Sequence, residues 1–511
     1  MTAIPHKTMA QCKRRIMARL EKNSIPEDGL PIFQASNIHY EIAKRTRGLI
    51  HGGIGLMHDF ARQIGLIKEI DSSLHVLKLH LPYHESDHVL NIAYNALCDG
   101  TCLQDIELRR NDEVFLDALN ATRIPDPTTA GDFCRRFKPE DIGNLQQAYD
   151  RVRLKVWARQ PDAFFDRATL DFDGTHVLTK GECKQGLDMN YKGEYSYHAL
   201  IVSLAETNEV LRIINRSGNR PSHEGAAEQA DQAIALCRQA GFRKIRLRGD
   251  TDFSQTAHLD QWDAAGDVEF LFGMDSRANL ELLADNLPAF AWVRLKRRAR
   301  YEVQTTPRGR WHNFKEDIVR LREYKNIRLV SEDVAEITYR PAACKKSYRL
   351  VIVRKNLMVE KGQLQLEPDY RYFFYLTNIP KEKASTAEIV FEANQRCNQE
   401  NIHAQLKGGV CSLTAPVDTL TSNWAYMVMA SLAWNLKAWF ALWLPERPGR
   451  HAEKHRQEKQ CVLKMEFKTF LNAFIKVPCQ LVRTGGKLVY RCLSWNPWQP
   501  VFFRLWATLQ E

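Results

Sequence analysis

The sequence predicts an α/β fold built on a central mixed sheet, with helical regions before and after it. From Ala168 the residue pattern gives three strands in succession, followed by alternating helix and strand. Two of these strands end in carboxylates: ATLDFDGTHV contains Asp173 and KIRLRGDTDF contains Asp250. In an RNase H-like fold this order of elements places the first and fourth strands side by side at the centre of the sheet. We therefore expect Asp173 to lie beside Asp250.

The region before the sheet is predicted to be helical. Residues 1–50 are mixed and polar and are expected to form an N-terminal arm. Residues 51–160 carry apolar residues at helical spacing, as in GLMHDFARQIGLIKEI, with a short helix over DPTTAGDFCRRF capped by Thr128 or Thr129. The glycines of HGGIG, from His51, are too sparse for a phosphate loop and predict a flexible turn. This helical domain can bind a DNA end or serve packing alone, and the sequence leaves both readings open.

The sheet is expected to be interrupted by an insertion. Residues 161–290 form the first part of the core, whose strands also include YSYHALIVSLAE, EVLRIINRSG and VEFLFGMD, with an amphipathic helix that ends at Gly241. Residues 291–378 are rich in β-strand patterns and in basic residues, which is typical of an inserted β-domain. Residues 379–410 then return to the core with one helix. The prediction is a core split in sequence and joined in space.

Residues 411–511 are predicted to form a basic, helical C-terminal region. A Trp-rich helix from Asn423 to Leu444 is followed by a basic linker, ERPGRHAEKHRQEKQ, and a helix over Val462–Ile475. A short hairpin is expected to turn at Gly485 and Gly486. From Asn401 to the end there are 14 Lys and Arg against 6 Asp and Glu, so most of the chain's net charge of +11 lies here. A polyanionic partner is consistent with this charge.

The helix of residues 379–410 carries charged residues on one side. Ser385 or Thr386 can cap it and Gly408 with Gly409 can stop it, which predicts a single helix from Ser385 to Lys407. Its apolar residues face elsewhere, toward a core. These charged residues form a stripe along the helix, which is either an ordinary solvent-exposed face or a face that holds a metal and a phosphate backbone. Its members, within roughly 40° of one another at 3.6 residues per turn, are Arg396, Glu400 and Lys407, and the apolar set is Phe391, Ile402 and Leu406.

Composition excludes several classes of protein. With 511 residues, 44% of them hydrophobic, the chain can bury a core in two to four domains. The 12 cysteines contain no CxxC pair, which argues against a zinc ribbon or a disulfide scaffold and favours a reducing cytoplasm. The N-terminus has no apolar core for a signal peptide. The apolar run in the Trp-rich helix contains Asn435 and Lys437, which favours a buried helix over a membrane span.

Three carboxylates can build a phosphoryl-transfer site. Two divalent metals about 3.5–4 Å apart can activate a water or a 3′-hydroxyl and stabilise the leaving oxygen. Such a site requires carboxylates that converge from adjacent strand ends and a neighbouring helix, because Mg²⁺ prefers hard oxygen ligands. Asp173, Asp250 and Glu400 can supply them.

Three motifs resemble those of a known family. LDFDGT, RGDTDF and NQRCNQENIHAQLKGG are similar to the signatures of bacterial DDE transposases with a Tyr-Arg-Glu-Lys motif, of the insertion-sequence thirteen-eighty family within the insertion-sequence-four-like group. The resemblance implies that Asp173, Asp250 and Glu400 are the catalytic metal ligands and that Arg396 and Lys407 contact DNA phosphates. Ala393 stands where the family has its tyrosine, so one phosphate or base contact is missing.

The function that the resemblance implies is DNA transposition. The protein would cut the ends of its element and join them to target DNA, using Mg²⁺, for which Mn²⁺ can substitute. Its partners would be double-stranded DNA, namely terminal inverted repeats and target DNA, bound by a homodimer in the cytoplasm at the nucleoid, without a membrane. A hairpin intermediate follows by analogy with relatives. The alternatives are a metal-dependent nuclease without strand transfer and a DNA-binding protein whose catalytic site has decayed.

Several residues keep two readings. Asp171 and Asp252 are each two positions from the chosen aspartates and would share their faces in a strand. Trp311 can stack on a flipped base or simply pack. His176 and His198 can contact DNA or satisfy backbone groups, and we favour the latter.

Overall fold

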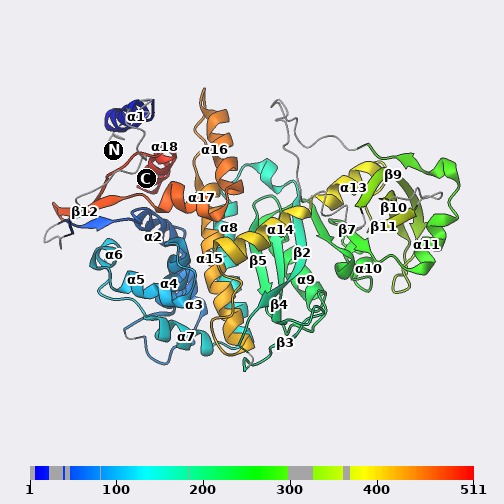
Figure 1. Cartoon of the computed structure of the whole chain (residues 1–511), viewed down its shortest axis with the longest axis horizontal. Coiled ribbons are helices and arrows are strands. Elements are labelled where there is room, and N and C mark those ends of the chain that lie inside the picture. Colours follow the sequence, from blue (N-terminus) through cyan, green and yellow to red (C-terminus); the bar gives the residue numbers. More distant parts are fainter. Residues whose placement is uncertain are drawn as a thin grey trace.

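The computed structural model describes residues 6–21, 38–40, 46–80, 82–181, 183–296, 326–360 and 369–510. Helices from both ends of the chain lie together at one end of the molecule, and a long sheet leads from the middle to the other end (Figure 1). The predicted α/β class is confirmed. Trp311 and most of the predicted arm of residues 1–50 lie outside the described residues.

The region before the sheet is helical, as predicted. The short helix α7 is capped by Asp126 rather than by Thr128 or Thr129: the Asp126 carboxylate accepts a hydrogen bond from the Thr129 amide (2.8 Å), and Pro127 occupies the first helical position. The helices in this region are α1 (His6–Glu21), α2 (Ile54–Gln63), α3 (Leu66–Ser73), α4 (Glu85–Leu97), α5 (Ile106–Arg110), α6 (Glu113–Ala118), α7 (Pro127–Arg135) and α8 (Pro139–Trp157).

The core strands have the expected order. The spatial sequence is β5, β4, β2, β6, β7, in which β2 and β6 are parallel and pair Leu170 with Leu247 and Phe172 with Gly249. The predicted neighbourhood of the first and fourth strands is therefore confirmed. These strands are β2 (Ala168–Leu178), β4 (Tyr195–Leu204), β5 (Glu209–Ile214), β6 (Ile245–Gly249) and β7 (Val268–Met274), with a short β3 (Asp188–Met189) on β4.

Helices cover the core and connect its later strands. Helix α9 ends at Gly241 as predicted, because that glycine takes a left-handed φ of 95°. The connecting helices are α9 (Ala226–Ala240), α10 (Leu259–Ala264) and α11 (Ala278–Asp285).

The described strands of the basic β-rich segment continue the same sheet. Strand β11 pairs antiparallel with β7, from Phe374 opposite Met274 to Thr377 opposite Leu271. The sheet thus runs on through β10, β9 and β8 to the far end of the molecule (Figure 1). These strands are β8 (Val293–Arg294), β9 (Asn326–Tyr339), β10 (Tyr348–Glu360) and β11 (Asp369–Thr377).

The helix predicted from Ser385 to Lys407 is instead three consecutive segments, α13 (Thr386–Asn394), α14 (Cys397–Ala404) and a π-helical turn (Gln405–Gly409). The Ser385 cap is confirmed. The break occurs because the Arg248 guanidinium takes the Glu392 carbonyl (2.8 Å), and the Arg396 amide bonds to Ala393 O (3.3 Å) instead. The break places Arg396 between α13 and α14.

The Trp-rich segment is a buried helix, α15 (Leu420–Trp443), packed between the helical region and the sheet (Figure 1). Its polar residues are bonded: Asn435 pairs with both backbone groups of Val210 (2.9 Å each), and the Lys437 ammonium donates to Leu463 O (2.8 Å). None of the helices among the described residues has the length and apolar character of a membrane span.

The C-terminal region closes against the N-terminal helices. The predicted basic linker is largely helical, because α16 (Ala452–Lys464) covers most of it, and the predicted helix over Val462–Ile475 is interrupted before α17 (Phe467–Phe470). The hairpin of β12 (Cys479–Thr484) and β13 (Lys487–Cys492) turns at Gly485 and Gly486 as predicted, and α18 (Gln499–Leu509) follows it.

The HGGIG glycines form a turn before α2, as predicted, and this turn packs tightly against the C-terminal region. A Cβ at Gly53 would lie 1.8 Å from the Phe474 carbonyl oxygen, and one at Gly52 would lie 2.4 Å from Cys479 Sγ. The strand β1 (Gly48–Leu49) pairs with β12 beside them. These glycines are required by close backbone approach.

Candidate active site

Two aspartates lie at the point where strand β6 ends beside β2. The last parallel pair is Phe172 with Gly249, and the next residue on each strand is Asp173 and Asp250. Strand β2 is buried up to Phe172 and becomes half-buried from Asp173, because its neighbour stops there. Asp250 leaves the strand and caps a 3₁₀ turn, accepting a hydrogen bond from the Asp252 amide (3.1 Å). The topology therefore brings the two carboxylates to one edge.

Arg396 joins these two carboxylates. Its Nη1 lies 3.2 Å from Asp173 Oδ2 and 3.9 Å from Asp250 Oδ2, and all three side chains are partly exposed. Glu400 follows one turn later on α14 with an exposed side chain, and it acts on Asp173 through charge. Lys407, on the π-helical turn, is also within electrostatic reach of Asp173. The five residues predicted from the sequence thus share one neighbourhood.

The site concentrates negative charge. Burial raises the pKa of Asp173 to about 7; the Arg396 guanidinium opposes this effect, while Asp250 and Glu400 add to it. Burial also raises the pKa of Asp250, again against Arg396. Burial lowers the pKa of Lys407, and Asp173 opposes that shift. A cation placed among these carboxylates would be strongly favoured.

The neighbouring aspartates have other environments. Asp171 is 1% exposed and forms a two-pronged pair with Arg248, whose Nε and Nη2 lie 2.6 and 2.8 Å from its oxygens. Burial raises the pKa of Asp171 to about 6, and the guanidinium opposes this. Asp252 is exposed on the 3₁₀ turn. Thus Asp173 and Asp250, rather than Asp171 and Asp252, face Arg396.

The sequence matches the family model described as transposase DDE domain group 1 over residues 49–511. That range is most of the chain. The chain belongs to the DDE transposase family. A search of the curated proteins found no match. Among solved structures the chain is similar to one titled as a cryo-EM synaptic complex of piggyBac transposase with hairpin DNA, at 10% identity and a TM-score of 0.34, with 84% of each chain covered.

DDE transposases generally use a divalent metal, and the donor atoms at this edge suit one. Carboxylate oxygens are the ligands that Mg²⁺ prefers, and Asp173 and Asp250 present such oxygens side by side. Within the described ranges, however, no three His, Cys, Asp or Glu side chains are arranged to close around one ion. This edge of the sheet therefore has donors of the type that a divalent metal requires, with Arg396 lying against two of them.

Two residues at this site were missed by the sequence analysis. Gln399 is fully buried; its Oε1 accepts a hydrogen bond from Ser203 Oγ (2.6 Å), and its Nε2 donates to Ile201 O (3.3 Å), which fixes α14 to β4. His403 is 8% exposed, and its Nδ1 lies 3.8 Å from Asp173 Oδ2. Burial lowers the pKa of His403 to about 3, so its ring is neutral. Neither polar residue gives a signal in the sequence.

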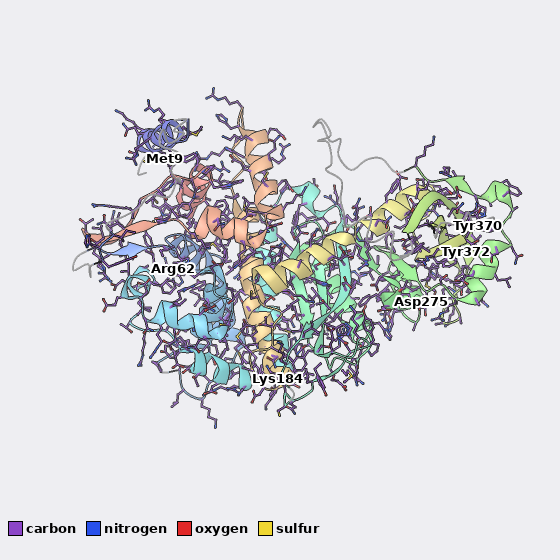
Figure 2. The ribbon with its side chains drawn as sticks, in the orientation of Figure 1. Met9, Arg62, Lys184, Asp275, Tyr370 and Tyr372 are labelled. Carbon is purple, nitrogen blue, oxygen red and sulfur yellow. The ribbon has the colours of Figure 1, made fainter. Side chains whose placement is uncertain are left out.

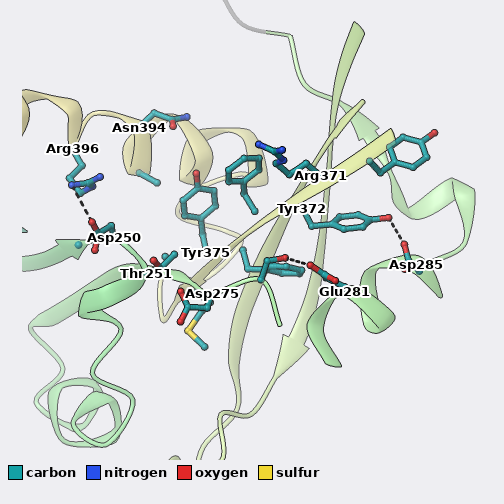
Figure 3. Close-up of a pocket in the computed structure, with 18 residues that line it drawn as sticks. Asp250, Thr251, Asp275, Glu281, Asp285, Arg371, Tyr372, Tyr375, Asn394 and Arg396 are labelled. Carbon is teal, nitrogen blue, oxygen red and sulfur yellow. Dashed lines mark hydrogen bonds and ion pairs between the residues drawn. The ribbon is translucent and has the colours of Figure 1, made fainter. Parts of the chain in front are cut away.

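A pocket of about 800 Å³ opens beside Asp250 and Arg396. Figure 3 shows Tyr372 and Tyr375 on its β11 wall. Its floor is acidic, and two of the carboxylates there are hydrogen-bonded: Asp285 accepts from the Tyr372 hydroxyl (2.5 Å) and Glu281 from Ser276 (2.6 Å) (Figure 3). The pocket lies between the edge of the sheet that carries Asp173 and Asp250 and strand β11.

Proposed function

We propose that this chain is the transposase of a bacterial insertion sequence of the thirteen-eighty family, which cuts its element's ends and joins them to target DNA by two-metal phosphoryl transfer. The observation that supports this most is the shared contact of Arg396 with Asp173 and Asp250, in a chain of the DDE transposase family. The strand order β5, β4, β2, β6, β7 supports an RNase H-like core, with residues 291–378 as its insertion domain.

In this proposal Asp173, Asp250 and Glu400 would hold Mg²⁺, or Mn²⁺ in its place. The bound ions would supply Lewis-acid stabilisation of the attacking and leaving oxygens. Arg396 and Lys407 would bind phosphate oxygens, which would draw the guanidinium away from the two aspartates. Gln399 would keep α14 on the sheet, and His403 would exclude water beside Asp173.

The DNA partner follows from the family and from charge. The basic C-terminal region and the helical domain of residues 51–160 would hold the terminal inverted repeats. A homodimer on DNA would bring two ends together, because both must be cut and joined in one event. We place this activity at the nucleoid in the cytoplasm, and a hairpin on the element's end would be its intermediate.

The test is incubation of the protein with the inverted repeats that flank its coding region and Mg²⁺. Joined products support the transposase. Ends that are cut but not joined support a nuclease without strand transfer, and retarded but intact DNA supports a decayed DNA-binding protein. Joined products in which an element end has been cut by hydrolysis would also show that cutting precedes joining.

The role of Glu400 is tested by one substitution and a matched control. Glu400→Gln is expected to abolish cutting and to keep end binding, because the amide keeps the shape and removes the charge. Asp252→Asn is the matched control: it removes an exposed carboxylate two residues from Asp250, and cutting is expected to persist. Full cutting by Glu400→Gln would remove that residue from the site.

A further inference from the structure

A row of rings leads outward from Asp173. His198 packs against the backbone of Gly174, so closely that a Cβ there would lie 2.6 Å from its Nε2. His176 stacks on His198 with ring centres 4.4 Å apart and planes 19° apart. Tyr191 follows, 5.8 Å from His176, and the Lys192 ammonium lies 5.4 Å from the Tyr191 ring centre. We call His198, His176, Tyr191 and Lys192 the ring track.

The two inner rings of the track are held by hydrogen bonds, and the outer ring is exposed to solvent. His198 is buried, and its Nδ1 bonds to Arg220 O (2.9 Å). His176 is half-buried, with its Nδ1 3.2 Å from Ser196 Oγ. Tyr191 is 83% exposed. The track therefore presents a supported aromatic ring to solvent at its outer end.

Other apolar side chains are exposed on the strands next to the turn that carries Tyr191. Met189 is paired with Tyr195 across β3 and β4, and Leu178 is opposite Ser196 at the end of β2. The exposed fractions of Leu178, Met189 and Tyr195 are 56%, 47% and 46%. By strand alternation Leu178 lies on the face of His176, and Met189 and Tyr195 lie on the opposite face, so both faces of this strand end are exposed.

The charge of this surface is mainly positive. After burial, the two largest causes that lower the pKa of His176 are the ammonium groups of Lys407 and Lys192, so both lie close to it. The carboxylate that acts on His176 is Glu194, and it accepts a hydrogen bond from Asn190 Nδ2 (3.3 Å). Lysines interleaved with aromatic rings are typical of nucleic-acid surfaces.

The pocket on the other side of the site has a different character. It is concave, its volume of about 800 Å³ is that of a small-molecule site, and its floor carries Asp275, Glu281 and Asp285. A cavity of this volume can take a strand end but is too small for a continuous duplex. Figure 2 shows Asp275 and Tyr372 of the pocket on the side of the molecule that carries β7 and β11, whereas β3, which Tyr191 follows, lies at the lower end of the core strands (Figure 1). The two surfaces therefore approach the aspartates from different sides.

We propose that the ring track binds the duplex of target DNA, with Tyr191 against the sugar-phosphate backbone and Lys192 and Lys407 on its phosphates. This inference rests on the proposed function. An in-line displacement requires the attacking 3′-hydroxyl and the leaving oxygen on opposite sides of the phosphorus. If the cut end approaches from the pocket, the DNA that is attacked must therefore lie on the other side of the aspartates, where the ring track is.

The experiment uses the full-length protein and element ends that already carry a free 3′-hydroxyl, so that cutting is bypassed. Joining to a plasmid is measured as a function of plasmid concentration. The double variant Tyr191→Ala with Lys192→Ala is expected to raise the concentration needed for half-maximal joining about tenfold. End binding and cutting of intact ends are expected to remain unchanged. Lys383→Ala, which removes an exposed lysine near Glu269 (3.6 Å), is the matched control and is expected to change nothing.

A direct probe keeps the inference testable if joining is weak. A benzoylphenylalanine placed at position 191 is expected to crosslink to labelled target duplex rather than to the element's end. An unchanged plasmid dependence in the double variant, equal losses of end binding and joining, or crosslinks to the end would each overturn the assignment. If the protein with benzoylphenylalanine at position 191 crosslinks duplex but the parent protein never cuts or joins, the transposase proposal fails while the duplex-binding surface stands.

Discussion

Replacement of Asp173 by asparagine should make the protein more stable at high pH. Folding raises the pKa of this carboxyl from 3.8 to about 7, chiefly through burial. A carboxyl with a raised folded-state pKa holds its proton more tightly in the folded protein, so its ionisation destabilises the fold as pH rises. The destabilisation is absent below the unfolded-state pKa, grows between pH 4 and pH 7, and is complete above that range. An asparagine does not titrate and avoids it.

The magnitude follows from the width of that window. Each pKa unit corresponds to about 1.4 kcal/mol. The stability difference between Asp173→Asn and the parent should therefore increase by about 3 kcal/mol between pH 5 and pH 8. The side chain is only 14% exposed, so solvent screening reduces this figure little.

The assay is urea denaturation of both proteins at pH 5 and pH 8, followed by tryptophan fluorescence, in EDTA so that no divalent ion binds. Titrating groups distant from Asp173 are common to both proteins and cancel in the comparison. A difference that stays constant with pH, or an asparagine variant that is less stable at pH 8, would refute the assignment of buried negative charge to Asp173.

Further predictions concern the buried polar groups and the metal. Glu209→Ala should lower the free energy of unfolding by about 3–5 kcal/mol, because fully buried Glu209 accepts from Arg153 Nε (2.9 Å), Trp157 Nε1 (2.9 Å) and Trp439 Nε1 (2.7 Å), and these buried donors would lose their acceptor; urea denaturation measures this, and a loss under about 1 kcal/mol would mean that these contacts are dispensable. Asp171→Asn should destabilise similarly by weakening its pair with Arg248, and it should leave Mn²⁺ binding intact; loss of Mn²⁺ binding in the folded variant would place Asp171 among the ligands. Gln399→Leu should lower the cutting rate with end binding retained, and an unchanged rate would show that α14 is held by other contacts. EDTA should stop cutting and added Mn²⁺ should restore it, whereas cutting that survives EDTA would exclude a divalent-ion mechanism.

Some of the structure follows from local sequence signals. The strands around Asp173 and Asp250 are runs of apolar residues that end in carboxylates, and their order along the chain specifies which of them are neighbours. The hairpin at Gly485 and Gly486 follows in the same way, because both glycines take positive φ there. In these cases the signal lies within a few residues of the feature.

Features that depend on distant contacts were not predictable. The break at Arg396 occurs because Arg248, far away in the chain, binds a carbonyl that a continuous helix would use. Gln399 looks like an ordinary polar helix residue, and only the packing of α14 on β4 shows its role. The glycines at Gly52 and Gly53 are explained by a C-terminal segment that no local pattern connects to them.

Iron-mediated cleavage of the polypeptide tests the convergence of the three carboxylates most directly. With Fe²⁺ in place of Mg²⁺, ascorbate and peroxide generate hydroxyl radicals at the bound ion, and these cut the backbone nearby. We expect fragments that end near Asp173, Asp250 and Glu400, all suppressed by excess Mg²⁺. Cleavage confined to other parts of the chain, or at one of the three alone, would contradict a shared metal site.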